Sequence, residues 1–165
     1  LKPITIPFCV DEHYQILGIK TGSIKAKGRL AEISVRKYGF REDQRVFALK
    51  SLLAELKSNI KVAPLSITTD SHPLYPKLIK EYFPGVEHIQ IISRDKLKKQ
   101  RELVFTAERK KIFDPMFALN QRCAKLRADI KRLARKSWCT TKKIENLQRH
   151  LKLYQSFNNE LVSIN

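Results

Sequence analysis

The stretch LSITTDSHPLYPKLIKEYFPGVEHIQII, residues 65–92, constrains the fold of this chain more than any other. It begins with alternating apolar and hydroxyl residues at 65–70, which is typical of a short strand. An amphipathic helix is predicted over 72–83, and a Pro-Gly pair ends it before the strand EHIQII at 87–92. A strand, a helix and a strand in so few residues predict a parallel pair with a crossover, and therefore an α/β domain.

Asp70 closes the first of these strands, where an ionised carboxylate is costly unless it is hydrated, paired or bound to a metal ion. One interpretation is that Asp70 caps the following helix, since Asp before Ser-His-Pro is a normal helix start. Another is that it holds a metal ion, because open parallel sheets place ligand sites at the carboxyl ends of their strands. The hydrophobic periodicity alone favours the cap, and the two roles are compatible.

Two apolar, β-branched runs lie near the start of the chain, ITIPFCV at 4–10 and QILGIKTGSI at 15–24. The polar tetrapeptide DEHY separates them, and this pattern predicts an antiparallel hairpin. Asp11 and Glu12 are then turn residues with little reason to be catalytic. The next segment, GRLAEISVRKYGF at 28–40, is predicted to be a strand or a loop.

Three further segments show apolar residues at helical spacing. A helix is predicted over 42–58, acidic at its start and basic near its end, as the helix dipole favours. Asp114 and Pro115 match an N-cap and a first helical residue, and a last helix is predicted over about 142–157. The predicted inward stripes are Val46, Leu49, Leu53 and Leu56 in the first helix, Leu119, Cys123, Leu126, Ile130 and Leu133 in the second, and Ile144, Leu147, Leu151 and Tyr154 in the third.

Basic residues outnumber acidic ones by 33 to 16, which gives a formal net charge of +17 and a pI near 10.0. The excess is concentrated between positions 94 and 152, which hold 19 basic and 6 acidic residues. This charge predicts a polyanionic partner, most often nucleic acid, and a merely solvated surface is the alternative. The basic segment 93–113 is predicted to be a loop or an extension that meets a partner. No apolar run approaches the roughly 20 residues of a membrane span, so no membrane partner is predicted.

The three cysteines, Cys9, Cys123 and Cys139, form no CxxC pair and lie in apolar or basic stretches. They are predicted to be small buried hydrophobic residues rather than zinc ligands or bridges. This pattern is typical of a reducing compartment, and we expect a cytoplasmic protein.

Several stretches resemble the catalytic domain of bacterial insertion-sequence transposases of the DDE type: TTDSHPLYPKLIKEYFP, DPMFALNQRCAKLRADIKRLARKSWCTTKK and LQRHLKLYQSFNNEL. The likeness extends through LKPITIPFCVDEHYQILGI and LAEISVRKYGFREDQ, so it covers nearly the whole chain. It implies an α/β fold with an RNase H-like mixed sheet, an antiparallel hairpin plus parallel strands, and a long C-terminal helical pair. The expected parts are a core at 1–113 that lacks its first strand and a basic helical part at 114–165 that completes the catalytic domain.

The resemblance implies an enzyme that cleaves DNA and transfers its strands during transposition, a form of DNA recombination. Two Mg²⁺ (or Mn²⁺) ions at the scissile phosphate would activate the attacking oxygen and stabilise the leaving one. The implied partners are the DNA of the element ends and of the target, and a homodimer is left open. The alternative is a catalytically inactive nucleic-acid-binding module derived from a transposase.

The resemblance also assigns candidate catalytic residues. Asp70 matches the second acidic residue of the family and is the firm metal ligand. The first belongs to a strand ahead of position 1, so the chain as given is expected to hold an incomplete site. The third position falls on Asn120, which offers an amide oxygen and no charge. Asp114, six residues earlier and roughly on the same side of the helix, either supplies the missing carboxylate to the metal or only caps the helix.

The basic residues of the C-terminal part are expected to neutralise DNA phosphates. His72 and His88 are lesser candidates, with an exposed helix start and a structural role as their alternatives. Trp138 offers an aromatic platform for an unpaired base, although packing between the last two helices is the better expectation. The predicted DNA-binding set is Arg122, Lys125, Arg127, Lys131, Arg132, Arg135, Lys136, Lys142 and Lys143.

Overall fold

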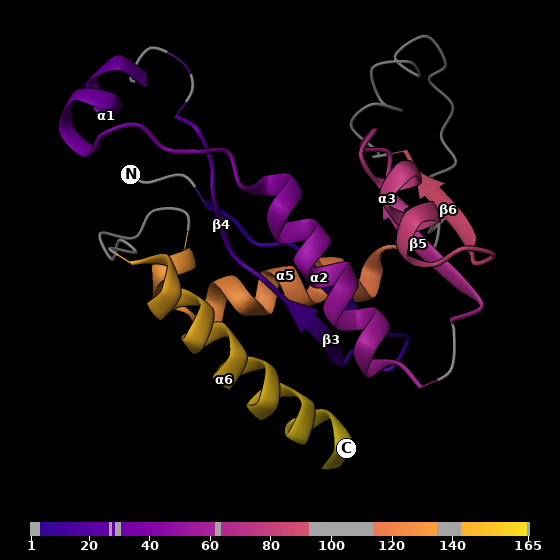
Figure 1. Ribbon diagram of the computed structural model, residues 1–165. Helices are drawn as coiled ribbons and strands as arrows, with labels where there is room; N and C mark the ends of the chain where they lie inside the picture. Colours follow the sequence, from indigo (N-terminus) through magenta and orange to yellow (C-terminus); the bar gives the residue numbers. More distant parts are fainter. Residues whose placement is uncertain are drawn as a thin grey trace, which may run out of the picture.

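The computed structural model describes residues 4–26, 28, 31–61, 64–92, 114–134 and 143–164. Over these residues the protein is a mixed α/β structure with five α-helices, one 3₁₀ helix and three two-stranded sheets (Figure 1). No helix in this described part is long and apolar enough to cross a membrane.

The predicted hairpin near the start of the chain is confirmed. Strand β2 (Phe8–Val10) pairs antiparallel with β3 (Ile16–Ile19), and β1 (Ile4–Thr5) pairs antiparallel with β4 (Gly22–Ser23). At the turn, a carboxylate oxygen of Asp11 accepts a hydrogen bond from the Gln15 backbone N–H at 2.8 Å. The backbone N–H of Asp11 donates to the carbonyl of Gln15 at 3.1 Å. Asp11 is therefore a turn residue, as predicted.

The prediction of a strand or loop at 28–40 is wrong, because helix α1 (Ala31–Tyr38) forms there. Ile33 and Val35 alternate with polar residues as they would in a strand, but both side chains are exposed and do not contribute to an apolar core. The helix ends at Gly39, which adopts the left-handed φ of 75° common after a C-terminus and donates its N–H to the carbonyl of Val35. The period-two pattern therefore carried no information about burial.

Helix α2 (Arg45–Asn59) confirms the helix predicted over 42–58. Three of the predicted inward residues are buried, but Val46 is 41% exposed, while Ala48 and Leu52 are buried in addition. The reason is the close approach of the hairpin: a Cβ on Gly18 would lie 2.7 Å from Leu52 Cδ1. The absence of a side chain at Gly18 lets α2 turn its Ala48–Leu52 side toward the sheet.

The parallel pair predicted from residues 65–92 is confirmed. Strand β5 (Ser66–Asp70) pairs in parallel with β6 (Glu87–Ile91), and helix α3 (Tyr75–Tyr82) connects them. Leu78 and Phe83 are buried against the leucines of α2, so the crossover shares one apolar cluster with that helix. A chain reversal at Gly85, with φ at 87°, brings β6 alongside β5.

Helix α5 (Phe117–Asp129), the 3₁₀ helix η1 (Lys131–Leu133) and helix α6 (Ile144–Ile164) follow. Leu126 and Ile130 are buried with Leu147 and Leu151, as predicted, and Leu133 and Tyr154 pack against this cluster. The second predicted helix ends at Asp129 because Ile130 is extended, and the last helix runs farther than the predicted 157.

The hairpin lies between two apolar clusters. Ile16 and Ile19 on β3 are buried with the α5–α6 cluster, whereas Leu17 and Cys9 pack against the α2–α3 cluster. Figure 1 shows the resulting arrangement, with α2 across one side of the hairpin and α5 and α6 on the other. The described hairpin and parallel pair are separate two-stranded sheets and do not join into the single mixed sheet that was expected.

Candidate functional site

Asp70 is the last residue of β5 and is exposed at the carboxyl edge of the parallel pair. Its Oδ1 accepts a hydrogen bond from the backbone N–H of His72 at 3.0 Å, which stabilises the turn into α3. Among the described residues, no donor bonds its Oδ2. The pKa of Tyr75 is raised, first by burial and then by the negative charge of Asp70. Asp70 therefore stabilises the turn that precedes α3 but does not cap the helix, because the N-cap is Leu74 and no side chain caps it, and Asp70 Oδ2 has no donor among the described residues.

The two candidate histidines have structural contacts. His72 is exposed, its Nδ1 accepts a hydrogen bond from the Leu74 N–H at 3.3 Å, and its ring meets that of Tyr75 edge-on. On β6, His88 Nε2 lies 2.9 Å from the hydroxyl oxygen of Thr69 on β5. These contacts hold the strand end and the start of α3 around Asp70.

The side chains of Asp114, in the turn before α5, and Asn120, in the first turn of α5, lie together. Asn120 Nδ2 donates to Asp114 Oδ2 at 3.0 Å, and the Met116 backbone N–H donates to Asp114 Oδ1 at 3.1 Å. The backbone N–H of Phe117 donates to the Asp114 carbonyl at 2.9 Å, so Asp114 organises the turn before the helix although α5 itself begins at Phe117. The carboxylate and the amide form one exposed polar pair.

The chemistry of this pair suits a hard cation, since carboxylate and amide oxygens are the ligands that Mg²⁺ accepts. In the part of the chain that the structure describes, however, no three His, Cys, Asp or Glu side chains gather closely enough to hold a metal ion. Asp70 and the Asp114–Asn120 pair are each engaged with the start of their own helix. The described residues therefore offer separate oxygen ligands and not a complete metal centre.

Arg122 is the exception among the described members of the predicted DNA-binding set, because its side chain is buried inside the protein. It is 8% exposed, its Nη1 donates to Asn158 Oδ1 at 2.9 Å, and its guanidinium lies 5.6 Å from the centre of the Tyr14 ring. Its Nε has no hydrogen-bond partner. Arg122 thus joins the hairpin turn, α5 and α6, and its assignment to a DNA-facing surface is corrected.

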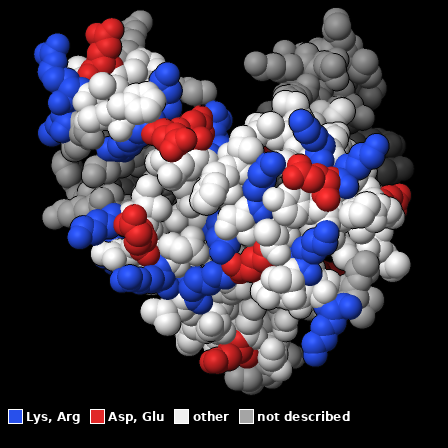
Figure 2. All heavy atoms as spheres, viewed as in Figure 1, with Lys and Arg blue, Asp and Glu red and all other residues white. Residues whose placement is uncertain are grey.

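The other described members of that set are exposed, on α5, on η1 and just before α6. Figure 2 shows Lys and Arg side chains spread over the visible face, with Asp and Glu side chains between them. Arg135, Lys136 and Lys142 lie outside the described residues, as do Trp138 and Cys139. The exposed cations of the set are Lys125, Arg127, Lys131, Arg132 and Lys143.

Glu55 on α2 is a charged contact that the sequence analysis missed. Its carboxylate forms ion pairs with Lys20, which follows β3, and with Lys152 on α6. Partial burial would raise the pKa of Glu55, but the hydrogen bonds and charges of the two lysines outweigh it, and the pKa lies below its ordinary value. No local pattern could have revealed this cluster, because the partners are 35 and 97 positions away in the chain.

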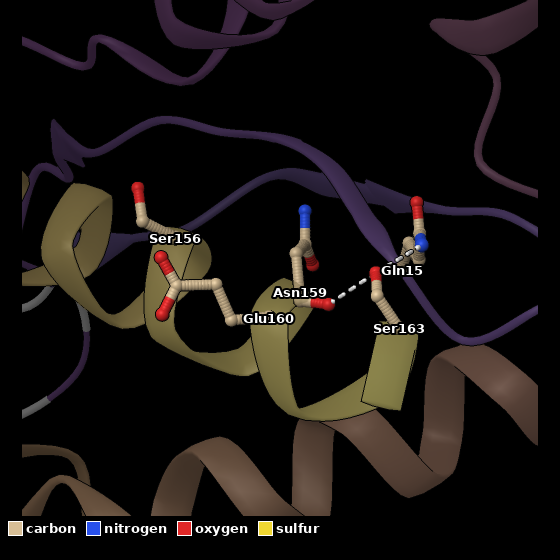
Figure 3. Close-up of a pocket in the computed structure, with 5 residues that line it drawn as sticks. All are labelled: Gln15, Ser156, Asn159, Glu160 and Ser163. Atoms are coloured by element: carbon tan, nitrogen blue, oxygen red, sulfur yellow. Dashed lines mark hydrogen bonds between the residues drawn. The ribbon is translucent and has the colours of Figure 1, made fainter. Parts of the chain in front are cut away.

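An open groove runs between the hairpin turn and the end of α6. Gln15, Ser156, Asn159, Glu160 and Ser163 line it (Figure 3). Two of its polar groups are already engaged, since Gln15 Nε2 donates to Ser163 Oγ at 3.3 Å and Ser163 Oγ donates to the Asn159 carbonyl at 2.9 Å. Most of its polar groups form hydrogen bonds that hold α6 against the hairpin. The groove is therefore not an enclosed ligand site.

The two described cysteines, Cys9 and Cys123, are free thiols, and both are half-buried where fully buried side chains were predicted. Burial, followed by the charge of Asp11, raises the pKa of Cys9 to about 11, so this thiol is not a nucleophile near neutral pH. Burial also raises the pKa of Cys123.

Comparisons with known proteins return no match, whether the chain is compared with family models, with curated proteins or with solved structures.

Proposed function

We propose that this chain is the catalytic part of a DDE-type DNA transposase, which cleaves and joins DNA strands with Mg²⁺ or Mn²⁺. The observation that carries the proposal is the place of Asp70, an exposed carboxylate at the carboxyl end of a parallel strand, with one oxygen unused by the described residues. Open α/β sheets bind their ligands at such strand ends. A metal ion held there would polarise a DNA phosphate and activate an attacking oxygen.

The proposal requires more carboxylates than the described residues bring together. Strand β5 pairs with β6 along one edge, so a further strand that carries an acidic residue beside Asp70 would pair along the other edge. Such a strand would also join the parallel pair to a larger sheet, as an RNase H-like fold demands. Asp114, with the amide of Asn120 beside it, is the candidate for the remaining ligand on α5.

The exposed cations of α5 and η1 support a nucleic-acid substrate. Lys125, Arg127, Lys131 and Arg132 lie within one short stretch that begins eleven residues after Asp114. Cations so arranged would contact backbone phosphates, and each contact would release counterions and add to the affinity.

The test is a nicking assay on supercoiled DNA with Mg²⁺ or Mn²⁺, using residues 1–165 and, if coding sequence precedes Leu1, a chain extended through it. Asp70→Asn keeps an oxygen that accepts the His72 N–H but removes the charge that a metal ion needs. We expect this variant to lose nicking while remaining folded. The matched control is Asp11→Asn, which likewise keeps the hydrogen bond of a turn carboxylate and should cut normally. Nicking that persists in Asp70→Asn refutes the proposed site.

A nucleic-acid-binding module without activity is the second candidate function. It is favoured by the engagement of Asp70 and Asp114 at helix starts and by the amide of Asn120 where the resemblance expects a carboxylate. If DNA binding measured by fluorescence anisotropy persists and neither chain cuts with either metal ion, this candidate replaces the enzyme.

A further inference from the structure

The outward side of α6 carries large apolar side chains. Leu153 is 72% exposed and Phe157, one turn later, is 59% exposed, and Leu161 continues the same row. Residues four apart lie on one side of a helix, so these side chains form a stripe. The opposite side of α6 is the one that enters the core, where Leu147 and Leu151 are fully buried. Figure 1 shows α6 along one edge of the molecule.

Two opposite charges flank this stripe at its two ends. Arg149 precedes Leu153 by four residues, and Glu160 follows Phe157 by three. The two are eleven residues apart, close to three helical turns, and so lie on the same flank of the stripe. Both side chains are exposed, and no ion pair engages either of them among the described residues.

We infer that α6 is a self-association surface, on which the α6 helices of two copies of this chain pair antiparallel. About a twofold axis near Gln155, Leu153 of one copy faces Phe157 of the other. The same register, to within one residue, sets Arg149 of each copy opposite Glu160 of the other. The twofold axis therefore produces two such ion pairs. A parallel pair would form neither ion pair, because its twofold axis sets opposite flanks of the two stripes against each other, so the charges favour the antiparallel arrangement.

This arrangement has the self-complementarity that a twofold interface needs, because the same patch supplies both sides. Its centre is apolar and its ends are charged, which is the usual anatomy of an interface with a buried core and a polar rim. The occupant of the stripe is therefore a second copy of the chain and not an unrelated protein. This inference is independent of the proposed catalytic function.

The first experiment measures the oligomeric state of the chain by sedimentation equilibrium. We expect a dimer whose dissociation constant rises roughly tenfold or more in Leu153→Asp, since an ionised carboxylate would then enter the apolar centre. Phe47→Asp is the matched control, because Phe47 on α2 is equally exposed at 72% but lies outside the stripe. Circular dichroism establishes that both variants are folded.

The second experiment tests the antiparallel arrangement with charge reversals. Arg149→Glu alone and Glu160→Arg alone place like charges against each other, and each variant should dimerise more weakly. Mixed together, the two variants should form a heterodimer with both ion pairs restored, at an affinity near that of the unmodified chain. Light scattering coupled to gel filtration measures all three samples.

Three results would overturn the inference. In the first, the chain would remain monomeric at concentrations approaching ~1 mM. Any dimer with a dissociation constant below that concentration would be detected there. Alternatively, Phe47→Asp would weaken the dimer while Leu153→Asp leaves it unchanged, which would locate the interface elsewhere. Finally, the mixture of charge variants would fail to recover the dimer, which would exclude the antiparallel pairing.

Discussion

Asn159 on α6 binds both backbone polar groups of Ile16 on β3. Its Oδ1 accepts the Ile16 N–H at 2.8 Å, and its Nδ2 donates to the Ile16 carbonyl at 3.0 Å. Gln155 also donates to that carbonyl at 2.8 Å, and Gln148 donates to the carbonyl of Ile19 at 2.9 Å. The outer edge of β3 is therefore satisfied by helix side chains instead of a neighbouring strand, which closes an edge that would otherwise be open to pairing.

This arrangement predicts unequal costs for two neighbouring substitutions. Asn159→Ala leaves the Ile16 N–H without its acceptor, and we expect it to lower the free energy of unfolding by about 1–3 kcal/mol. Gln155→Ala should cost less, because Asn159 still satisfies the same carbonyl. Urea unfolding followed by circular dichroism measures both, with the exposed Ser156→Ala as control. An equal loss of unfolding free energy in the two variants would show that these side-chain amides do not stabilise β3 through its backbone groups.

The buried pair of Arg122 and Asn158 predicts strong coupling. Arg122→Met deprives Asn158 Oδ1 of its donor, and Asn158→Leu deprives a buried guanidinium of its acceptor. Each single change should destabilise the protein by about 1–3 kcal/mol, because each leaves a buried polar group unpaired. The double variant removes both groups and should cost clearly less than the sum of the two. A double-mutant cycle of unfolding free energies tests this, and additive costs would contradict the pairing.

Glu55 predicts a loss of stability in acid. Its pKa is lowered in the folded protein by Lys152 and Lys20, so its contribution is complete above the unfolded pKa of roughly 4.3 and disappears as the pH falls through the lower folded value. The stability difference between the unmodified chain and Glu55→Gln should therefore be largest near neutral pH and shrink below about pH 4. Unfolding curves across this range measure it. Glu32→Gln, on the exposed α1, should show no such trend, and a constant difference for Glu55→Gln would refute the ion-pair cluster.

The burial of Arg122 predicts how DNA binding responds to salt. If the chain binds duplex DNA as proposed, replacing the exposed Lys131 with Gln should remove one phosphate contact and reduce the slope of log affinity against log salt by about 0.9. Arg122→Met should leave the slope unchanged, because the guanidinium lies inside the protein. Fluorescence anisotropy at several salt concentrations gives both slopes. A reduced slope in folded Arg122→Met would restore Arg122 to the DNA-binding set.

Elements defined by local pattern could be predicted from the sequence. The hairpin around the turn at Asp11, the strand–helix–strand of residues 65–92 and the buried leucines of α6 all follow from residues within a few positions of one another. Each of these features depends on short-range geometry that the order of residues already contains.

The sequence alone therefore determined where the chain makes its hairpin, its parallel pair and its apolar helix faces, since periodicity is a property of neighbouring residues. Only the tertiary structure decided which polar side chains are buried inside the protein. Arg122 is one cation among many in the sequence. It is buried because two residues from distant segments contact it: the Tyr14 ring lies against its guanidinium, and Asn158 accepts its hydrogen bond. Likewise, the amides of α6 serve a strand more than 120 positions away. The physical reason is that burial and hydrogen-bond satisfaction depend on which segments meet, and that is settled by the packing of the whole chain.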